Sequence, residues 1–202
     1  MKASFAFAIL LVALGGASTP LPGADAARRA LSSFDADSCE NKLNRIKAFA
    51  PVKKAGASQT VYFTEDELNA WLALRFKLRA HPCLKDLAVE LEDGQALVTA
   101  AIDFNRLRED ADGVLPKIIA FMFSGVHTIS AHGKVVSGDG KGMFDVDRAR
   151  FDNVVIPGYL MNEILSAVGL RQSPPVDPSK LSPLPFGLDR MDVRKGSLLA
   201  YQ

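Results

Sequence analysis

The sequence has little excess charge, few cysteines and no apolar run long enough to span a membrane. Its 202 residues carry 24 Lys and Arg against 23 Asp and Glu, which gives a formal net charge of +1. That balance argues against a protein that neutralises nucleic-acid phosphates, because such binding needs a basic excess or stripe. Two cysteines are too few for a disulfide scaffold and, alone, for a structural zinc site. Hydrophobic residues make up 48% of the chain, which is enough to bury a core.

The N-terminus has the pattern of an export signal. Lys2 precedes an uncharged apolar run over residues 3–14, and small residues follow that run. The run is shorter than the roughly 20 residues of a membrane-spanning helix, which disfavours the alternative of an N-terminal membrane anchor. Cleavage after Ala17 or after Ala26 would fit the pattern. We therefore expect residues 1–26 to be a secretory signal peptide and the mature protein to be exported, either periplasmic or extracellular.

Export changes the interpretation of the two cysteines. Cys39 and Cys83 would meet oxidising conditions, so we predict a single disulfide bond between them. Closing that loop would stabilise the fold by about 4 kcal/mol in the chain-entropy model. The alternative is a pair of buried thiols. A reactive thiol is disfavoured, because neither cysteine lies in a nucleophile or Cys-x-x-Cys context.

The mature chain divides into an N-terminal helical segment, residues 27–58, and a domain over residues 59–202. In the first, apolar residues recur at helical spacing (Leu43, Ile46, Phe49) before Pro51. The second begins with a short strand over residues 59–63.

Thr64 and Glu67 then form a capping-box pattern. The threonine hydroxyl can accept from the backbone N–H three residues on, and the glutamate can reach back to the threonine N–H. A helix over residues 65–78 is predicted, ending before His81 and Pro82.

Three hairpins are indicated by turn residues between alternating segments. Asp93 and Gly94 form the strongest of these signals. The resulting register would pair Leu91 with Ala96, Val89 with Val98, Leu87 with Ala100, Glu90 with Leu97 and Ala88 with Thr99. A second hairpin over residues 126–153 turns at residues 138–140, and a third, over residues 188–201, turns at Lys195 and Gly196.

The second hairpin has an apolar face and a polar face. The apolar face would hold Ile129, Ala131, Val135, Phe144 and Val146, and the polar face His132, Lys134, Asp145 and Asp147. Strands of this kind form a sheet with one buried side. Together with the helices, they predict an α+β fold in which helices lie along one face of a curved antiparallel sheet.

The residues that could carry chemistry are few. His132 with Asp145 or Asp147 is the one acid–base pair that the register predicts, and no nucleophile stands beside it. The glycines at positions 138, 140 and 142 lie in a hairpin turn and not between a strand and a helix, so they do not indicate a dinucleotide site. His127 and His132 fall on opposite strand faces, which disfavours a shared metal. We therefore expect no enzyme activity, cofactor or metal; a hydrolase built on His132 is the catalytic alternative.

Apolar segments are more prominent than polar ones. Residues 158–168 have an amphipathic helical pattern, and residues 114–123 contain only one charge, Lys117. A helix that is apolar nearly all round must be fully buried or must contact something apolar. Because the mature domain is small, a ligand groove or a membrane contact competes with simple burial as the explanation for residues 114–123.

Several short motifs resemble a known family. They are Val61-x-Phe63-Thr64-Glu65-x-Glu67-Leu68-Asn69-Ala70, the Asp-Gly hairpin, a second hairpin with Gly133 and Gly140, Ile156-Pro157 before a helix, and Leu184-Pro185-Phe186-Gly187-Leu188 before a final hairpin. Over residues 59–201 this arrangement resembles small exported bacterial proteins related to the tubular lipid-binding (TULIP) superfamily. The resemblance implies a curved antiparallel sheet wrapped around one or more long helices, with an apolar groove for lipid acyl chains.

The function implied by this resemblance is the non-catalytic binding or carrying of a lipid or another long apolar ligand, with transient membrane contact and no nucleic acid. The alternative is a structural or interaction module of the cell envelope with a filled core. The lipid-binding residues would be Trp71, Leu72, Phe76, Val89, Val98, Ile129, Phe144, Leu160, Met161, Ile164 and Leu165. A lid or membrane-touching edge would be formed by Ile118, Ile119, Phe121, Met122 and Phe123.

Overall fold

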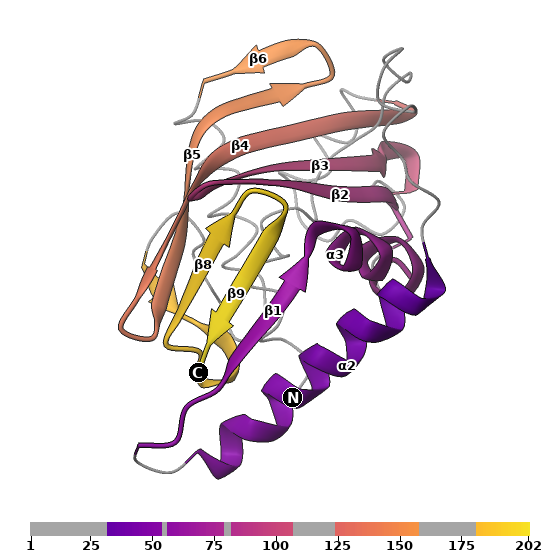
Figure 1. Cartoon of the computed structure of the whole chain (residues 1–202). Coiled ribbons are helices and arrows are strands. Elements are labelled where there is room, and N and C mark those ends of the chain that lie inside the picture. The colour runs from indigo at the N-terminus through magenta and orange to yellow at the C-terminus, as the bar shows by residue number, and fades with distance from the viewer. Residues whose placement is uncertain (1–31, 54–55, 79–81, 107–123, 158–180) are drawn as a thin grey trace.

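Two antiparallel sheets and two helices make up the described part of the molecule (Figure 1). The computed structural model describes residues 32–53, 56–78, 82–106, 124–157 and 181–202. The predicted α+β class and the large antiparallel sheet are confirmed. Residues 1–26, 114–123 and 158–168, on which several predictions fall, lie outside the described residues.

The larger sheet has six strands, with the order β2-β3-β4-β5-β6 and β7 paired to β5. Its strands are β2 (Leu84–Glu92), β3 (Gln95–Asp103), β4 (Val126–Gly138), β5 (Lys141–Phe151), β6 (Val154–Ile156) and β7 (Ser182–Pro183). The smaller sheet has the order β1-β9-β8, with β1 (Thr60–Thr64), β8 (Arg190–Arg194) and β9 (Ser197–Tyr201). A short 3-10 turn, η5 (Pro185–Gly187), precedes β8. The first and last strands of the domain are therefore neighbours.

The predicted register of the β2–β3 hairpin is confirmed pair by pair. Leu91 lies opposite Ala96 and Val89 opposite Val98, and the other predicted pairs also hold. Gly94, at φ 70°, takes the left-handed position of the turn, where glycine meets no steric cost. The register is fixed because a slip by one residue would turn the buried face to water.

The β4–β5 hairpin is bent by a bulge. His132 pairs with Arg148 and Gly133 with Val146, which leaves Asp147 as an extra residue in β5. A Cβ atom at position 133 would lie 2.3 Å from the carbonyl oxygen of Asp145, so this close approach requires glycine. A bulge increases the local twist of a strand, and the hairpin end of β4 and β5 turns toward β8, which it contacts (Figure 1).

Helix α2 (Ser33–Phe49) begins at Ser32, whose hydroxyl accepts hydrogen bonds from the amides of Phe34 and Asp35. Its buried side is apolar and includes Leu43 and Ile46, the spacing that predicted it. A short 3-10 turn, η3 (Ala50–Val52), follows. Helix α2 packs on the second helix, α3 (Glu65–Trp71), and on β1, so it covers the small sheet and α3 rather than the middle of the large sheet.

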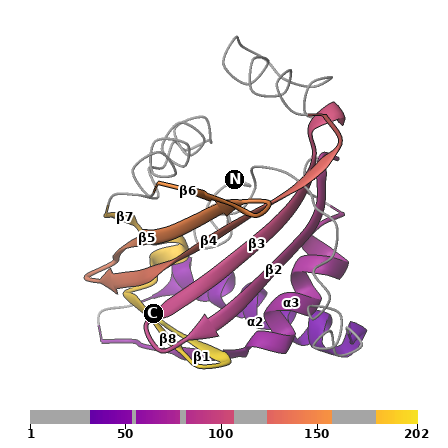
Figure 2. The ribbon, with the colours of Figure 1, turned by 90° about the horizontal axis from the view of Figure 1, so that it is seen from above.

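Helix α3 (Glu65–Trp71) continues into a π-helical turn, η4 (Leu72–Phe76). The predicted helix over residues 65–78 is therefore correct at its start and about two residues too long. In the widened turn the amide of Lys77 donates to the carbonyl of Leu72 at 3.0 Å, five residues back. Helices α2 and α3 lie on the same side of the large sheet (Figure 2), and α3 and η4 pack on its edge strand β2. Among the described residues, no helix has the length and apolar character needed to cross a membrane.

Candidate functional site

The polar residues of the motif at positions 64–69 hold helix α3 in place. Thr64 Oγ1 accepts from the amide of Glu67 at 3.1 Å, and a Glu67 carboxylate oxygen accepts from the amide of Thr64 at 2.9 Å. The predicted capping box is therefore confirmed.

The carboxylate of Glu67 also binds helix α2. It accepts from Ser38 Oγ at 2.6 Å and from Lys42 Nζ at 2.6 Å, although its residue is only 7% exposed. Burial raises the pKa of Glu67, but hydrogen bonds from Lys42, Ser38 and the Thr64 amide outweigh burial and leave the pKa below its ordinary value. The ionised carboxylate of Glu67 therefore links α2 to α3 through its hydrogen bonds, and it is not suited to proton transfer.

Glu65 and Asn69 bind the outer edge of strand β2. The amide of Leu91 donates to Glu65 Oε2 at 2.6 Å. The side chain of Asn69 makes two hydrogen bonds to the backbone of Val89, one to its N–H and one to its carbonyl, each 2.8 Å long. The amide of Gly196 donates to the carbonyl of Leu91 at 3.0 Å. Since these contacts satisfy backbone groups of an edge strand, the motif has a structural role.

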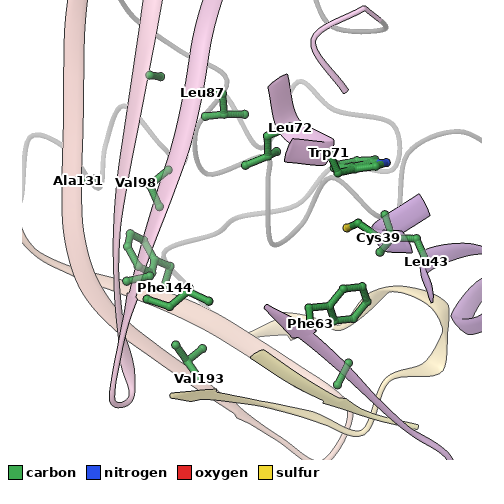
Figure 3. Packing of buried hydrophobic residues seen from close by; sticks show 14 of the residues in the cluster. Cys39, Leu43, Phe63, Trp71, Leu72, Leu87, Val98, Ala131, Phe144 and Val193 are labelled. Carbon is green, nitrogen blue, oxygen red and sulfur yellow. The ribbon is translucent and has the colours of Figure 1, made fainter. Parts of the chain in front are cut away.

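Seven of the predicted lipid-binding residues lie in the described part of the chain, and the fold brings them together. Trp71, Leu72 and Phe76 come from α3 and η4, and Val89, Val98, Ile129 and Phe144 come from the large sheet. Figure 3 shows Leu72 and Trp71 between Leu87 of the sheet and Cys39 of α2. Four of the seven are buried, with exposed fractions of 2% for Leu72 and 3% for Phe144. Their predicted contact with a lipid stays a prediction.

The remaining predicted residues fall outside the described residues. They are Ile118, Ile119, Phe121, Met122, Phe123, Leu160, Met161, Ile164 and Leu165.

We call the face of the large sheet on which α3 and η4 pack its inner face (Figure 3). One row of side chains runs across this inner face. Leu87 pairs with Ala100, Ala100 with Ile129, Ile129 with Phe151, and Phe151 with Val154. Leu87 and Ala100 are buried, whereas Ile129 and Phe151 are half-buried and Val154 is 68% exposed. In the described part of the chain, α3 and η4 pack mainly on β2. The apolar face of the sheet therefore extends beyond these helices.

Both cysteines lie in the hydrophobic core, in α2 and just before β2. The structure has them as thiols, so it does not contain the predicted Cys39–Cys83 disulfide bond. Burial raises the pKa of the Cys39 thiol to about 12, and the nearby charge of Glu67 adds to this effect. A thiol of this kind is unreactive at neutral pH, which disfavours Cys39 as a nucleophile.

The predicted pairing of His132 with an aspartate is confirmed for Asp147. His132 Nδ1 lies 2.7 Å from Asp147 Oδ1, and His132 Nε2 lies 3.6 Å from Glu92 Oε2. The hydrogen bond to His132 lowers the pKa of Asp147. The other candidate, Asp145, lies opposite Lys134 instead.

A second histidine–carboxylate pair was not predicted from the sequence. His127 Nδ1 lies 2.8 Å from Asp152 Oδ2, and the two residues are joined across β4 and the turn after β5. The long spacing of 25 residues gives no local signal; an aspartate beside Asn153 at the end of a strand was the available hint of a turn. Within the described residues, no group of three or more His, Cys, Asp or Glu side chains could hold a metal ion.

No family model matches this chain, and it has no significant match among curated proteins or among solved structures.

Proposed function

We propose that this chain is an exported, non-catalytic protein that holds a long apolar ligand, such as a lipid acyl chain, in a groove along the inner face of the six-stranded sheet. The observation that supports the proposal is the row from Leu87 to Val154. All of its side chains are apolar, but the described helices α3 and η4 pack mainly at its β2 end, and the residues toward β5 and β6 are more exposed. In this proposal the sheet curves around the helical side of the domain, and the bulge at Gly133 contributes to that curvature.

The energetics set a condition on the groove. Lifting one acyl chain of about 15 methylenes out of a membrane costs about 12 kcal/mol at roughly 0.8 kcal/mol per methylene. A carrier must offer nearly equivalent apolar burial. The chemistry of the described wall supports the proposal, since Val89, Val98 and Ile129 are all hydrocarbon side chains on one face.

Two measurements test the proposal. Organic extraction and native mass spectrometry of the purified protein should reveal bound lipid, and a naphthylamine lipid probe should bind the native state. Ile129→Asp places a carboxylate in the wall and should weaken probe binding at least tenfold, an order-of-magnitude expectation for a charge in an apolar site. Ser130→Asp adds the same charge on the opposite face of the same strand and should leave probe binding unchanged.

Protein without lipid from several expression hosts, combined with no probe binding, would contradict the proposal. Equal loss of probe binding in the two variants would contradict the assignment to this face. Thermal unfolding of each variant identifies a simple folding defect, and Ile129→Thr then provides a milder change at the same position.

A filled-core structural or interaction module is the second candidate, and one observation favours it. Leu72, Phe144 and Val98 are only 2%, 3% and 7% exposed, as side chains in a closely packed core are. This alternative predicts that neither lipid nor probe binds and that Ile129→Asp affects only stability.

A further inference from the structure

His127 lies where the ends of three strands meet. It is the second residue of β4, and it pairs with Ile102 near the end of β3. Its side chain reaches Asp152 in the turn between β5 and β6. Its Nδ1 atom lies 2.8 Å from Asp152 Oδ2, and its Nε2 atom lies 2.9 Å from the carbonyl oxygen of Ser124. Both ring nitrogens therefore face oxygen atoms. The carbonyl oxygen of Ser124 is an acceptor only, and the carboxylate of Asp152 is also an acceptor only when it is ionised.

The number of protons on the ring decides how many of these bonds form. A neutral imidazole has one N–H and one lone pair, whereas an imidazolium has two N–H donors. The protonated ring of His127 can donate to Asp152 and to Ser124 together. The neutral ring loses one of the two bonds and turns a lone pair toward an oxygen.

Asp152 carries the turn that joins β5 to β6. Its backbone has φ 51°, a conformation that aspartate tolerates better than most residues. Its Oδ1 atom accepts from the amide of Thr128 at 2.8 Å, and its own amide donates to the carbonyl of Thr128 at 2.6 Å. The same carboxylate therefore holds the start of β4 through one oxygen and His127 through the other.

Among the described residues, the rings of Phe104 and Phe151 and the carboxylate of Asp152 surround the ring of His127. The ring centroid of His127 lies 5.7 Å from that of Phe104 and 5.2 Å from that of Phe151. The nearest other carboxylate on the neighbouring strand, Asp103, is paired with Lys85 at 3.2 Å and also accepts from the amide of Arg106. Strand β6 contributes only apolar side chains.

We propose that His127 is a pH-sensitive latch that fastens the β5–β6 turn to the start of β4. The protonated ring closes the latch, so its stabilising effect is fully present at acidic pH. The effect is lost when the ring gives up its proton as pH rises, because only the protonated ring has two N–H donors. Opening then loosens Asp152 and with it β6, whose valines 154 and 155 are already exposed.

Amide hydrogen exchange of the whole protein, followed by NMR, tests the latch. The amides of Thr128 and Asp152 report on it directly, since both bonds pass through Asp152. After correction for the intrinsic pH dependence of exchange, their opening should become about fivefold more frequent between pH 5.5 and pH 8, the scale of a partly exposed ion pair. His127→Gln does not titrate and should abolish this change, whereas His132→Gln removes the other pair and should retain it.

The nitrogen shifts of the His127 ring provide a second readout. They should be those of an imidazolium at pH 5.5. A neutral ring at that pH, a flat exchange profile in the native chain, or the same pH response in His127→Gln would each overturn the latch. If His127→Gln does not fold, Asp152→Asn keeps an acceptor for the Thr128 amide, removes the charge, and should flatten the profile in the same way.

Discussion

The two edges of the large sheet are closed in different ways. At the β2 edge, side chains of α3 bind the outward backbone groups of Val89 and Leu91, and the β8–β9 turn adds a further hydrogen bond from Gly196. At the other edge lies β6, a strand of three residues with Val154 and Val155 exposed. One edge is thus covered by polar side chains that replace a neighbouring strand, and the other is short and apolar.

This difference changes the interpretation of the motif that suggested a family. Exposed strand edges invite pairing with other chains, and proteins cover them or shorten them. Thr64, Glu65, Glu67 and Asn69 all act in the cover of β2 or in the anchoring of the helix that provides it. The motif therefore reports on how a helix is attached to a sheet edge, whereas the proposed ligand site depends on apolar residues outside it.

Removing the cover of β2 should have the largest effect. Glu65→Ala combined with Asn69→Ala deletes three hydrogen bonds to strand backbone, and at about 1 kcal/mol each the free energy of unfolding should fall by about 3 kcal/mol. Urea denaturation measures this loss. Sedimentation should also detect self-association through the opened edge. Glu90→Ala, an exposed change on the same strand, serves as the control; an equal loss there would mean that the cover has no special role.

Breaking the anchor of the covering helix should have a smaller effect. Glu67→Gln keeps the shape of the side chain but removes the charge that Lys42 and Ser38 bind, so the free energy of unfolding should fall by about 2 kcal/mol. Denaturation of the variant at pH 7 measures the loss. Retention of full stability would show that the Glu67 charge contributes little beyond the capping box.

Acid should remove the same contribution from the native chain. Because the pKa of Glu67 is lowered in the fold, its charge stabilises the protein above the pKa that the group has when unfolded, about 4.3. The stability is lost as pH falls below that value and through the lower folded pKa. Denaturation at pH 7 and pH 3 should therefore show a larger loss in the native chain than in Glu67→Gln. Equal losses would place the acid sensitivity elsewhere.

A charge on the β6 edge should have the smallest effect. Val155 is 65% exposed and lies opposite Arg150, so Val155→Glu gains a cross-strand ion pair and loses little burial. The free energy of unfolding should change by no more than about 0.5 kcal/mol. Val155→Thr keeps the β-branched shape without charge and is the matched control. A loss well above 1 kcal/mol in the glutamate variant alone would show that this edge is covered by apolar contacts after all.

The sequence predicts local pairings well and long-range ones poorly. The β2–β3 register follows from Asp93, Gly94 and the alternation around them, because the turn and the apolar face agree. The extra residue in β5 was not predicted, although strict alternation from Val146 would turn Arg148 inward, which indicates an interruption of the ladder. The lengthened turn at Leu72 gave no signal, because its residues keep a helical pattern.

The candidate site was predictable only as a set of apolar positions. Periodicity brought Leu72, Val98 and Phe144 to one interior, as the structure has them. The partners of Asn69 and His127 lie 20 and 25 residues away, so their roles depend on how separate strands and helices pack. Periodicity reports on which side of an element is apolar and not on which element it meets.

The bulge at Asp147 shifts the alternation of inward and outward side chains along β5 by one residue. Residues 144 and 146 face inward before it and residues 149 and 151 face inward after it, so the spacing changes from two to three at that point. If β5 kept Asp147 but paired as a regular ladder without the bulge, every later side chain of the strand would be inverted, placing two arginines where alanine and phenylalanine now pack. The extra residue therefore keeps apolar side chains on the inward face on both sides of the bulge, and it also supplies the carboxylate that His132 contacts.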